Sequence, residues 1–291
     1  MRDQAGAEQG EAVLTQALAG YQTALGSRLV AAYALGSLAH GGFSPLVSDV
    51  DIGLVLADPP RLKDRVMIRS IGNAARAGGS ELHQRLSVFW GTPGILQGRS
   101  RGGRFPPLDR LDLIEHGRLL AGTDVRDGIA RPVQAELLVA GAEFALGYLG
   151  GDPDLAQRLR RLAARGPRGD DPVTELRTPA VLLSRGHRRV TKVVLFPVRF
   201  LYTAATGQVG TNAAAVEHYL AGRPVPAAEL VSAAFAWRRE PPANDTAAAL
   251  LAQELLPLYV HYIDDHVERL EAAGSHRLAG RFRRWRARLL A

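Results

Sequence analysis

The 291-residue chain contains no cysteine and no long apolar run. The missing thiols exclude disulfide bonds, thiolate zinc sites and a cysteine nucleophile. A membrane-spanning helix needs about 18 consecutive apolar residues, and no stretch approaches that length. The N-terminal residues carry acidic side chains and lack the apolar segment of an export signal. We therefore expect a soluble, cytoplasmic protein with no membrane partner.

Lysine is also scarce, because 34 of the 36 basic residues are arginine. The formal charge of +7 would favour a nucleic-acid or other anionic partner. The scarcity of lysine and the abundance of Ala, Gly and Pro indicate a GC-rich coding bias, which weakens that inference. The most basic run, residues 277–288, carries apolar residues at helical spacing. We interpret it as an amphipathic helix with a solvated arginine face and expect no nucleic-acid partner.

Helix and strand patterns alternate in the first part of the chain. Apolar residues recur every three or four positions in residues 11–30 and 61–76, as they do in amphipathic helices. Three short apolar runs, bounded by Gly, Ser or Pro, have the length of strands: residues 29–35, 50–56 and 86–90. We predict an α+β fold, in which residues 1–127 form a domain with a small mixed sheet flanked by helices.

Strand patterns fade after about residue 132, and long helical patterns remain. These patterns cover residues 133–150, 153–165, 189–206, 211–221, 226–238 and 246–272. Residues 166–179 contain three prolines and few apolar side chains, so we predict a loop there. We expect residues 128–291 to form an all-α helical bundle. No pattern indicates the oligomeric state.

The residues best suited to chemistry lie between positions 35 and 56. An apolar run ends in Gly36-Ser37, a glycine-rich turn follows, and a second apolar run surrounds Asp51. Side chains alternate along a strand, so Asp49 and Asp51 project to one face. Two apposed carboxylates repel each other unless a cation neutralises them, and such oxygen ligands suit Mg²⁺. Gly36 allows close backbone approach, and Ser37 offers a hydroxyl and an N–H to phosphate oxygens.

The same residues have a purely structural interpretation. Ser48-Asp49 would then cap a turn, and Gly36 would merely end a strand. An isolated Asp-x-Asp pair is weak evidence, because such pairs occur by chance in surface turns. Here both elements border apolar runs at a spacing that lets two neighbouring strands present them at one end. We therefore favour a site for a metal ion and phosphate.

Gly36-Ser37, an eleven-residue spacer and Asp49-Val50-Asp51 together resemble the nucleotidyltransferase superfamily related to DNA polymerase β. Gly41-Gly42, Ser48 and residues 193–210 extend the resemblance to the antibiotic adenylyltransferases of the streptomycin and spectinomycin group. It covers most of residues 30–125 and 190–270. The resemblance implies Mg²⁺-dependent chemistry on an NTP, with ATP the expected one, and a cleft between the domains for the acceptor.

The resemblance also assigns roles to residues of the second half. Arg199 matches an arginine that contacts the triphosphate, and Ser48 belongs to the nucleotide motif. A lysine expected after Thr-Gly is Gln208 here. Lys192 lies two helical turns before Arg199, so both side chains can share one face. We take Lys192 as the replacement cation; the alternative is an ordinary exposed lysine.

The third carboxylate of the family, expected on the next strand, aligns with Ser87. A serine is no base at neutral pH without help. We select Glu136 as the general base by its similarity to a kanamycin nucleotidyltransferase, whose base is a glutamate on the corresponding helix; the alternative is a surface acid. Three arginines of the loop at residues 98–107, Arg99, Arg101 and Arg104, are candidates for a cationic lid; the alternative is an ordinary solvated loop.

These observations favour an enzyme that moves an NMP, with AMP the expected group, from an NTP to a hydroxyl of a small molecule. The acceptor would be aminoglycoside-like or another polar natural product, and pyrophosphate would be released. Two alternatives stay open. One is a nucleotide-binding regulator that has lost turnover together with the third carboxylate. The other is a protein AMPylase.

Overall fold

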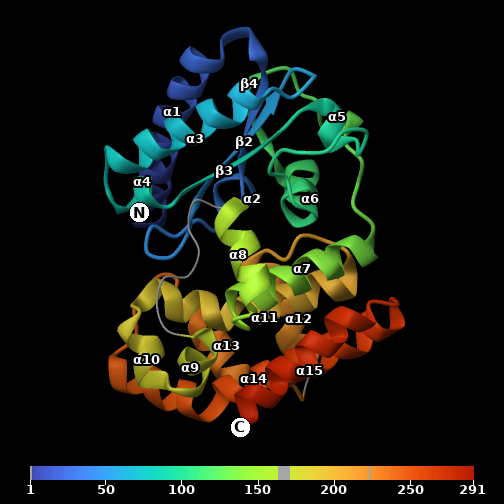
Figure 1. Ribbon diagram of the computed structural model, residues 1–291. Coiled ribbons are helices and arrows are strands. Elements are labelled where there is room, and N and C mark those ends of the chain that lie inside the picture. The colour runs from blue at the N-terminus through green and yellow to red at the C-terminus, as the bar shows by residue number, and fades with distance from the viewer. Residues whose placement is uncertain (1, 163–170, 223) are drawn as a thin grey trace. The chain divides into compact units, whose positions relative to one another are not determined.

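The computed structural model describes residues 2–162, 171–222 and 224–291. Its internal contacts divide the chain into two compact units, one ending at Pro132 and the other beginning at Val133. The predicted boundary was residue 127. In Figure 1 the first unit is coloured from blue to green and the second from green to red.

A four-stranded mixed sheet forms the centre of the first unit, with strand order β3-β2-β1-β4. The strands are β1 (Leu29–Leu35), β2 (Val50–Leu56), β3 (Leu86–Gly91) and β4 (Arg118–Gly122). Strand β1 is antiparallel to β2 and β4, whereas β2 and β3 are parallel. The predicted α+β fold class is confirmed. Strand β4 was not predicted, because its five residues at the sheet edge are exposed or half-buried and show no apolar alternation.

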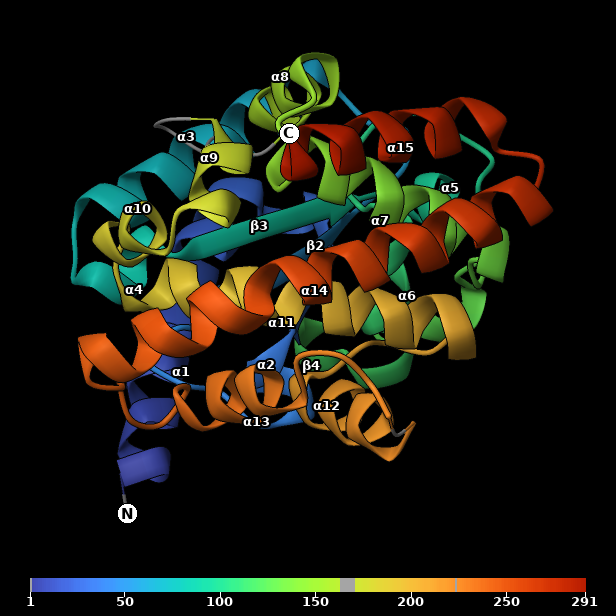
Figure 2. The ribbon, with the colours of Figure 1, turned by 90° about the horizontal axis from the view of Figure 1, so that it is seen from below.

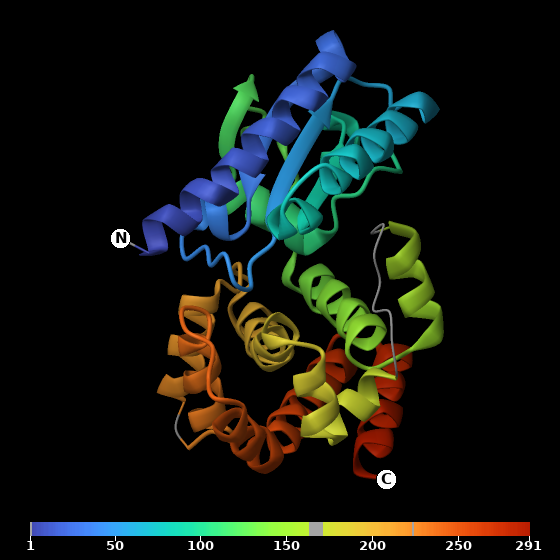
Figure 3. The same cartoon turned by 90° about the vertical axis from the view of Figure 1, so that its left-hand side faces the viewer.

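Helices cover both faces of this sheet. The helices are α1 (Arg2–Leu25), α2 (Ser37–His40), α3 (Leu62–Ala77), α4 (Glu81–Gln84), α5 (Pro93–Leu96) and α6 (Pro107–His116), with short 3-10 turns at Gly26–Arg28 and Arg126–Gly128. Helices α1 and α3 lie together over one face, as Figure 3 shows. Val50, Ile52 and Leu54 belong to the core on that side.

The opposite face of the sheet has its own, smaller core. Val55 of β2 packs there with Leu96 of α5 and Leu113 of α6. Alternation along β2 therefore sends the even-numbered residues toward α1 and α3 and the odd-numbered residues toward α6. Asp51 is one of these odd-numbered residues, and it lies at the end of β2 where the apolar cover gives way to polar side chains.

The second unit consists of helices and their connections, with no strand in its described residues. Its helices are α7 (Gln134–Tyr148), α8 (Pro153–Leu162), α9 (Pro172–Arg177), α10 (Pro179–Ser184), α11 (His187–Thr206), α12 (Asn212–Ala221), α13 (Ala228–Ala236), α14 (Asn244–Ala272) and α15 (His276–Leu290). Helix α11 contacts α7, α12, α13 and α14, and Figure 2 shows α14 running beside it. Gly207 ends α11 in the left-handed conformation that favours glycine.

The loop predicted at residues 166–179 is partly wrong, because Pro172–Arg177 forms helix α9. Asp171 caps that helix by accepting a hydrogen bond from the Val173 N–H, and Pro172 stands at its first turn, where a proline costs no hydrogen bond. Residues 163–170 lie outside the described residues. No helix in the described ranges is both long enough and apolar enough to cross a membrane.

The basic run at the C-terminus forms α15, whose apolar residues Phe282, Trp285 and Leu289 are buried. Its arginines do not simply face solvent. Arg281 pairs with Asp152, Arg286 with Asp264, and Arg288 with Asp171. Ion pairs to the neighbouring elements therefore engage much of the charge that the composition suggested for an anionic partner.

We expect Asp64→Ala to lower the free energy of unfolding of the first unit by about 3 kcal/mol. The Asp64 side chain is 1% exposed and accepts hydrogen bonds from the Arg28 guanidinium (2.6 Å) and the Arg61 N–H (3.0 Å). Its loss leaves the largely buried Arg28 without this partner and removes a hydrogen bond at the start of α3. Scanning calorimetry measures the change. Glu11→Gln, which breaks an exposed pair with Arg118, is the control and should matter little; equal effects would contradict the argument.

Candidate functional site

Asp49 and Asp51 stand at the start of β2, on either side of the fully buried Val50. Both aspartates are half-buried. Asp51 is paired in the sheet with Leu35 of β1 on one side and Ser87 of β3 on the other. Val50 anchors this segment in the core on the α1 side, so the neighbouring carboxylates are directed toward the face that carries α6.

Gly36 packs directly against the Asp51 carboxylate. A Cβ atom built on Gly36 would lie 2.5 Å from Asp51 Oδ2, so a side chain there would require the Asp51 carboxylate to move. The backbone of Gly36 also has φ +61°, in the range that favours glycine. Its carbonyl accepts hydrogen bonds from the Ala39 and His40 N–H groups, which begins the short helix α2 at Ser37. The glycine thus joins the end of β1 to the Asp51 side chain.

Asp112, on α6, is a buried acid of this region that the sequence pattern did not reveal. Its Oδ2 accepts a hydrogen bond of 2.6 Å from the Gly36 N–H. The residue is 9% exposed, and its Oδ1 has no hydrogen-bond partner in the described structure. An acid between Leu111 and Leu113 has no distinguishing sequence signal, because charged residues on helices usually face water.

Ser87 lies beside Asp51 in the neighbouring parallel strand, where the alignment predicted the third carboxylate of the family. Paired residues of adjacent strands project to the same face, so Ser87 accompanies Asp51 with a hydroxyl in place of an acid. The nearest acid in sequence is Glu81, the first residue of α4, and it forms an ion pair with Arg85, which follows that helix. Strand β3 therefore contributes no carboxylate beside Asp51.

Arg104 is held at the edge of the sheet. Its backbone forms a bridge with Trp90, its Nη1 donates a hydrogen bond of 2.6 Å to the Val88 carbonyl, and its Cζ lies 4.8 Å from the centre of the Phe89 ring. Burial lowers the pKa of Arg104, while the charges of Asp109 and Asp51 act in the opposite direction. These contacts hold Arg104 at the sheet edge, and the cationic lid stays a prediction. Arg99 and Arg101 are exposed.

Ser48 is 8% exposed, and its hydroxyl accepts a hydrogen bond of 3.0 Å from the Ser44 N–H. The Ser48 N–H in turn donates to the Ser44 carbonyl at 2.8 Å. These reciprocal bonds close the turn that leads into β2. The predicted contact of Ser48 with a nucleotide stays a prediction.

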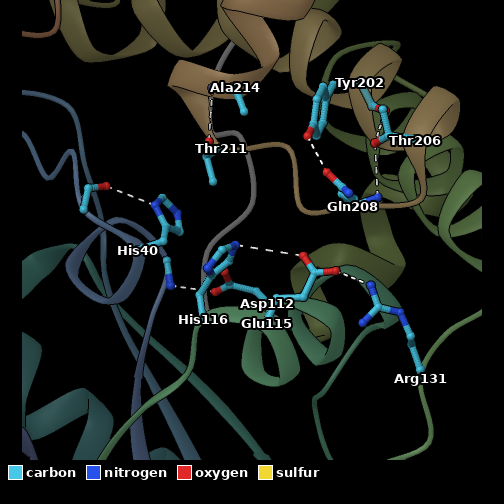
Figure 4. A network of polar contacts seen from close by, with 12 residues as sticks. His40, Asp112, Glu115, His116, Arg131, Tyr202, Thr206, Gln208, Thr211 and Ala214 are labelled. Carbon is cyan, nitrogen blue, oxygen red and sulfur yellow. Dashed lines mark hydrogen bonds and ion pairs between the residues drawn. The ribbon is translucent and has the colours of Figure 1, made fainter.

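Two histidines from different helices, His40 and His116, lie together near the turn that follows Gly36, and no sequence pattern groups them. The rings of His40, at the end of α2, and His116, at the end of α6, meet edge to face with 5.4 Å between their centroids. Figure 4 shows Asp112, Glu115 and His116 along α6, with Glu115 between His116 and Arg131. Helix α6 therefore brings Asp112 and His116, which are distant in sequence, to the turn formed by Gly36 and α2.

In the helical unit, Arg199 and Lys192 are half-buried residues of α11. The Arg199 Nε donates a hydrogen bond to the Gly210 carbonyl, and its Cζ lies 5.9 Å from the centre of the Phe196 ring. Gln208, which stands where the family has a lysine, accepts a hydrogen bond of 2.7 Å from the Tyr202 hydroxyl (Figure 4). The predicted roles of Arg199 and Lys192 stay predictions.

Glu136 has a structural role at the start of α7. Its Oε2 accepts a hydrogen bond of 3.2 Å from the Val133 N–H, the contact of a helix cap, and the residue is exposed. Glu143, two turns further along, pairs with Arg158 at 2.9 Å. Capping does not prevent a glutamate from accepting a proton, so the assignment of Glu136 as base stays a prediction.

The first unit offers a cation two carboxylates rather than a complete cage. In the described part of the chain, no three His, Cys, Asp or Glu side chains gather as metal ligands. Asp49 and Asp51 are the oxygen donors that Mg²⁺ prefers, and this ion commonly takes its other ligands from water and substrate phosphates. The close approach that Gly36 permits at Asp51 keeps one side of that carboxylate free of carbon side chains. The residues present therefore fit a magnesium ion shared with a nucleotide.

No protein-family model and no curated protein sequence matches the chain. Among solved structures it is similar to a spectinomycin adenyltransferase, AAD(9) from Enterococcus faecialis, whose crystal structure contains ATP and spectinomycin. The sequences are 12% identical, the TM-score is 0.55, and the alignment covers 85% of this chain and 98% of the other. At that identity the likeness concerns the fold alone. The chain has an adenylyltransferase-like fold.

Proposed function

We propose that this protein is a magnesium-dependent nucleotidyltransferase that moves AMP from ATP to a hydroxyl group of a small molecule. The observation that carries the proposal is the pair Asp49 and Asp51 at the start of a central strand, with Gly36 packed against Asp51. The adenylyltransferase-like fold, matched over 85% of the chain, supports it. In this proposal residues 1–127 are the nucleotidyltransferase domain and residues 128–291 the helical domain.

Asp49 and Asp51 would hold the metal ion, which when bound neutralises phosphate charge and orients the triphosphate. Gly36, Ser37 and Ser48 would contact the phosphates from the turns beside β2. Arg199 and Lys192 would bind the β- and γ-phosphates from α11. Arginine suits that task because it is a permanent cation, and the bond from its Nε to the Gly210 carbonyl orients the guanidinium.

The reaction would be an in-line transfer. The hydroxyl oxygen of the acceptor forms a bond to the α-phosphorus as the bond from that phosphorus to the β-phosphate oxygen breaks, so pyrophosphate leaves. The hydroxyl proton passes to a base, for which we propose Glu136. Positioning of the reactants and stabilisation of negative charge would supply most of the rate increase.

The acceptor would be a polar natural product that carries hydroxyl groups. The similar solved structure contains spectinomycin, which supports this class of acceptor. The net charge of +7 favours an acceptor with less positive charge than most aminoglycosides. Incubation with radiolabelled ATP, GTP, CTP and UTP and a panel of hydroxylated metabolites, with detection of pyrophosphate, tests the proposal.

A second candidate is a nucleotide-binding regulator without turnover. It is favoured by Ser87 beside Asp51 and by Gln208 in the place of a lysine, since both changes remove charges that the catalytic family uses. Nucleotide binding without pyrophosphate release, for every acceptor in the panel, would support this second candidate.

Asp49→Asn and Asp51→Asn should each lower the rate of transfer by about 100-fold or more, because each removes a charge that would hold the metal ion. The fold should persist, since both residues are half-buried at the end of a strand. Pyrophosphate release measures the rate, and circular dichroism checks the fold. Asp127→Asn, an exposed acid of the same unit, is the matched control. Retention of a tenth of the activity by both site variants would remove the proposal.

Arg199→Ala should raise the KM for ATP by roughly 10- to 100-fold, the effect of losing a hydrogen bond to a charged group. The KM for the acceptor should change little, because the proposed contact is with phosphates that do not react. Steady-state kinetics with each substrate varied separates the two. Arg158→Ala, which removes an exposed arginine of the same unit, is the control. A change confined to the acceptor KM would place Arg199 in the acceptor pocket instead.

Glu136→Gln should lower kcat by roughly 10² to 10⁴, the usual cost of removing a general base. Glutamine still offers an oxygen to the Val133 N–H, so the helix cap should survive. The pH profile of kcat should lose its acidic limb in the variant. Glu143→Gln, on the same helix, is the control and should retain activity. If the two variants behave alike, Glu136 is only a capping residue.

A further inference from the structure

We propose that Asp112 is a positioning residue of this site, whose buried carboxylate holds the Gly36 peptide and thereby fixes the Asp51 side chain. The proposal rests on the function proposed above, since it assumes that Asp51 holds a cation. It concerns a residue on α6, 61 positions away from Asp51 in sequence, that joins the site only through the fold.

Asp112 is an acid in a buried position, which is energetically costly. Asp112 is 9% exposed, with Leu111 and Leu113 fully buried on either side of it. Burying a carboxylate is unfavourable unless hydrogen bonds or charges compensate. Replacing such a group with an apolar one is often neutral or stabilising. The stability of α6 alone therefore does not account for an acid at this position.

Asp112 contacts the backbone of Gly36. Its Oδ2 accepts the Gly36 N–H at 2.6 Å, a short bond with charge on the acceptor. Such bonds are stronger than bonds between neutral groups. Gly36 has φ +61° and ψ −148°, and it connects β1 to α2. The bond therefore holds a turn whose backbone angles differ from those of the elements on either side.

The turn at Gly36 also adjoins the Asp51 carboxylate. The Cα of Gly36 forms part of the surface against which Asp51 Oδ2 lies, because a Cβ there would be only 2.5 Å from that oxygen. A rotation of the Gly36 peptide would move this surface and change the side-chain orientations open to Asp51. The hydrogen bond from the Gly36 N–H to Asp112 therefore acts on Asp51 through the Gly36 peptide.

The unpartnered oxygen of Asp112 is an independent observation. Its Oδ1 is buried and has no hydrogen-bond partner in the described structure. A buried polar atom of this kind usually has a functional explanation or is satisfied by a water molecule or an ion. In a magnesium site, a water molecule of the metal ion would be a suitable partner. The Asp112 carboxylate thus keeps one buried acceptor that the described structure does not satisfy.

The test is the binding of Mn²⁺ to the full chain, with and without a non-hydrolysable ATP analogue, followed by electron paramagnetic resonance. Asp112→Ala should weaken Mn²⁺ binding by roughly 10- to 100-fold, the usual effect of removing a group that orients a metal ligand. Asp112→Asn should stay within about 3-fold of the wild type, since its amide oxygen can still accept the Gly36 N–H. The kcat should follow the same order.

Two further variants guard against loss of folding. Asp112→Leu is branched at the same carbon as aspartate, though bulkier, lacks the oxygens and suits the apolar surroundings, so it carries the test if Asp112→Ala unfolds. It should bind Mn²⁺ as weakly as Asp112→Ala. Asp64→Ala destabilises the same unit away from the site and should leave the Mn²⁺ affinity unchanged. A fall in affinity for Asp64→Ala as large as that for Asp112→Ala would overturn the proposal.

Other results separate this proposal from the function on which it rests. Wild-type Mn²⁺ binding that Asp49→Asn abolishes but Asp112→Ala and Asp112→Leu leave intact would overturn only the role of Asp112. Equal losses in Asp112→Asn and Asp112→Ala would also overturn it, because charge rather than the hydrogen bond would then be responsible. Absence of Mn²⁺ binding by the wild type would remove both proposals.

Discussion

The contact between Gly36 and the Asp51 carboxylate is the constraint on which the candidate site depends. A side chain at position 36 would displace that carboxylate, and the backbone of Gly36 has a conformation that favours glycine. The same glycine donates its N–H to the carboxylate of Asp112. Two acids from different elements thus meet the two sides of one residue, and the position of each depends on that residue.

The rest of the first unit keeps this arrangement in place. Val50, Ile52 and Leu54 are fully buried on one face of β2, so the strand cannot shift without exposing them. A one-residue shift would also turn Asp51 into the core on the α1 side. On the other face, Leu111 and Leu113 fix α6 and hold Asp112 between them. Apolar packing therefore offsets the electrostatic cost of gathering like charges at the strand end.

The charges of this arginine-rich chain have distinct uses. Arg281, Arg286 and Arg288 of α15 pair with acids of the same unit, so this basic helix is not simply a cationic surface. Arg104 and Arg199 are held differently, since each donates a side-chain hydrogen bond to a backbone carbonyl and lies against an aromatic ring. Such contacts restrict the orientation of each guanidinium.

The sequence alone determined the local features of this protein. Periodicity identified strands β1, β2 and β3 and most helices, because burial on one face imposes a regular spacing of apolar residues. Strand alternation placed Asp49 and Asp51 together, and the aligned Ser87 lies beside Asp51 in the sheet. Helix α9 was missed because its six residues are too few to establish a helical period, and they lay in a segment rich in proline and charge.

Only the tertiary structure decided which distant residues join the site. Asp112 is brought to Gly36 by the packing of α6 on β1, and nothing in the residues around it announces that contact. Strand β4 forms at the sheet edge because β1 offers it a partner, although its own side chains are largely exposed. Arg104, in the glycine-rich loop, is brought to the sheet edge by backbone pairing with Trp90. Sequence patterns record what each segment buries, whereas contacts between segments depend on how the segments are packed in three dimensions.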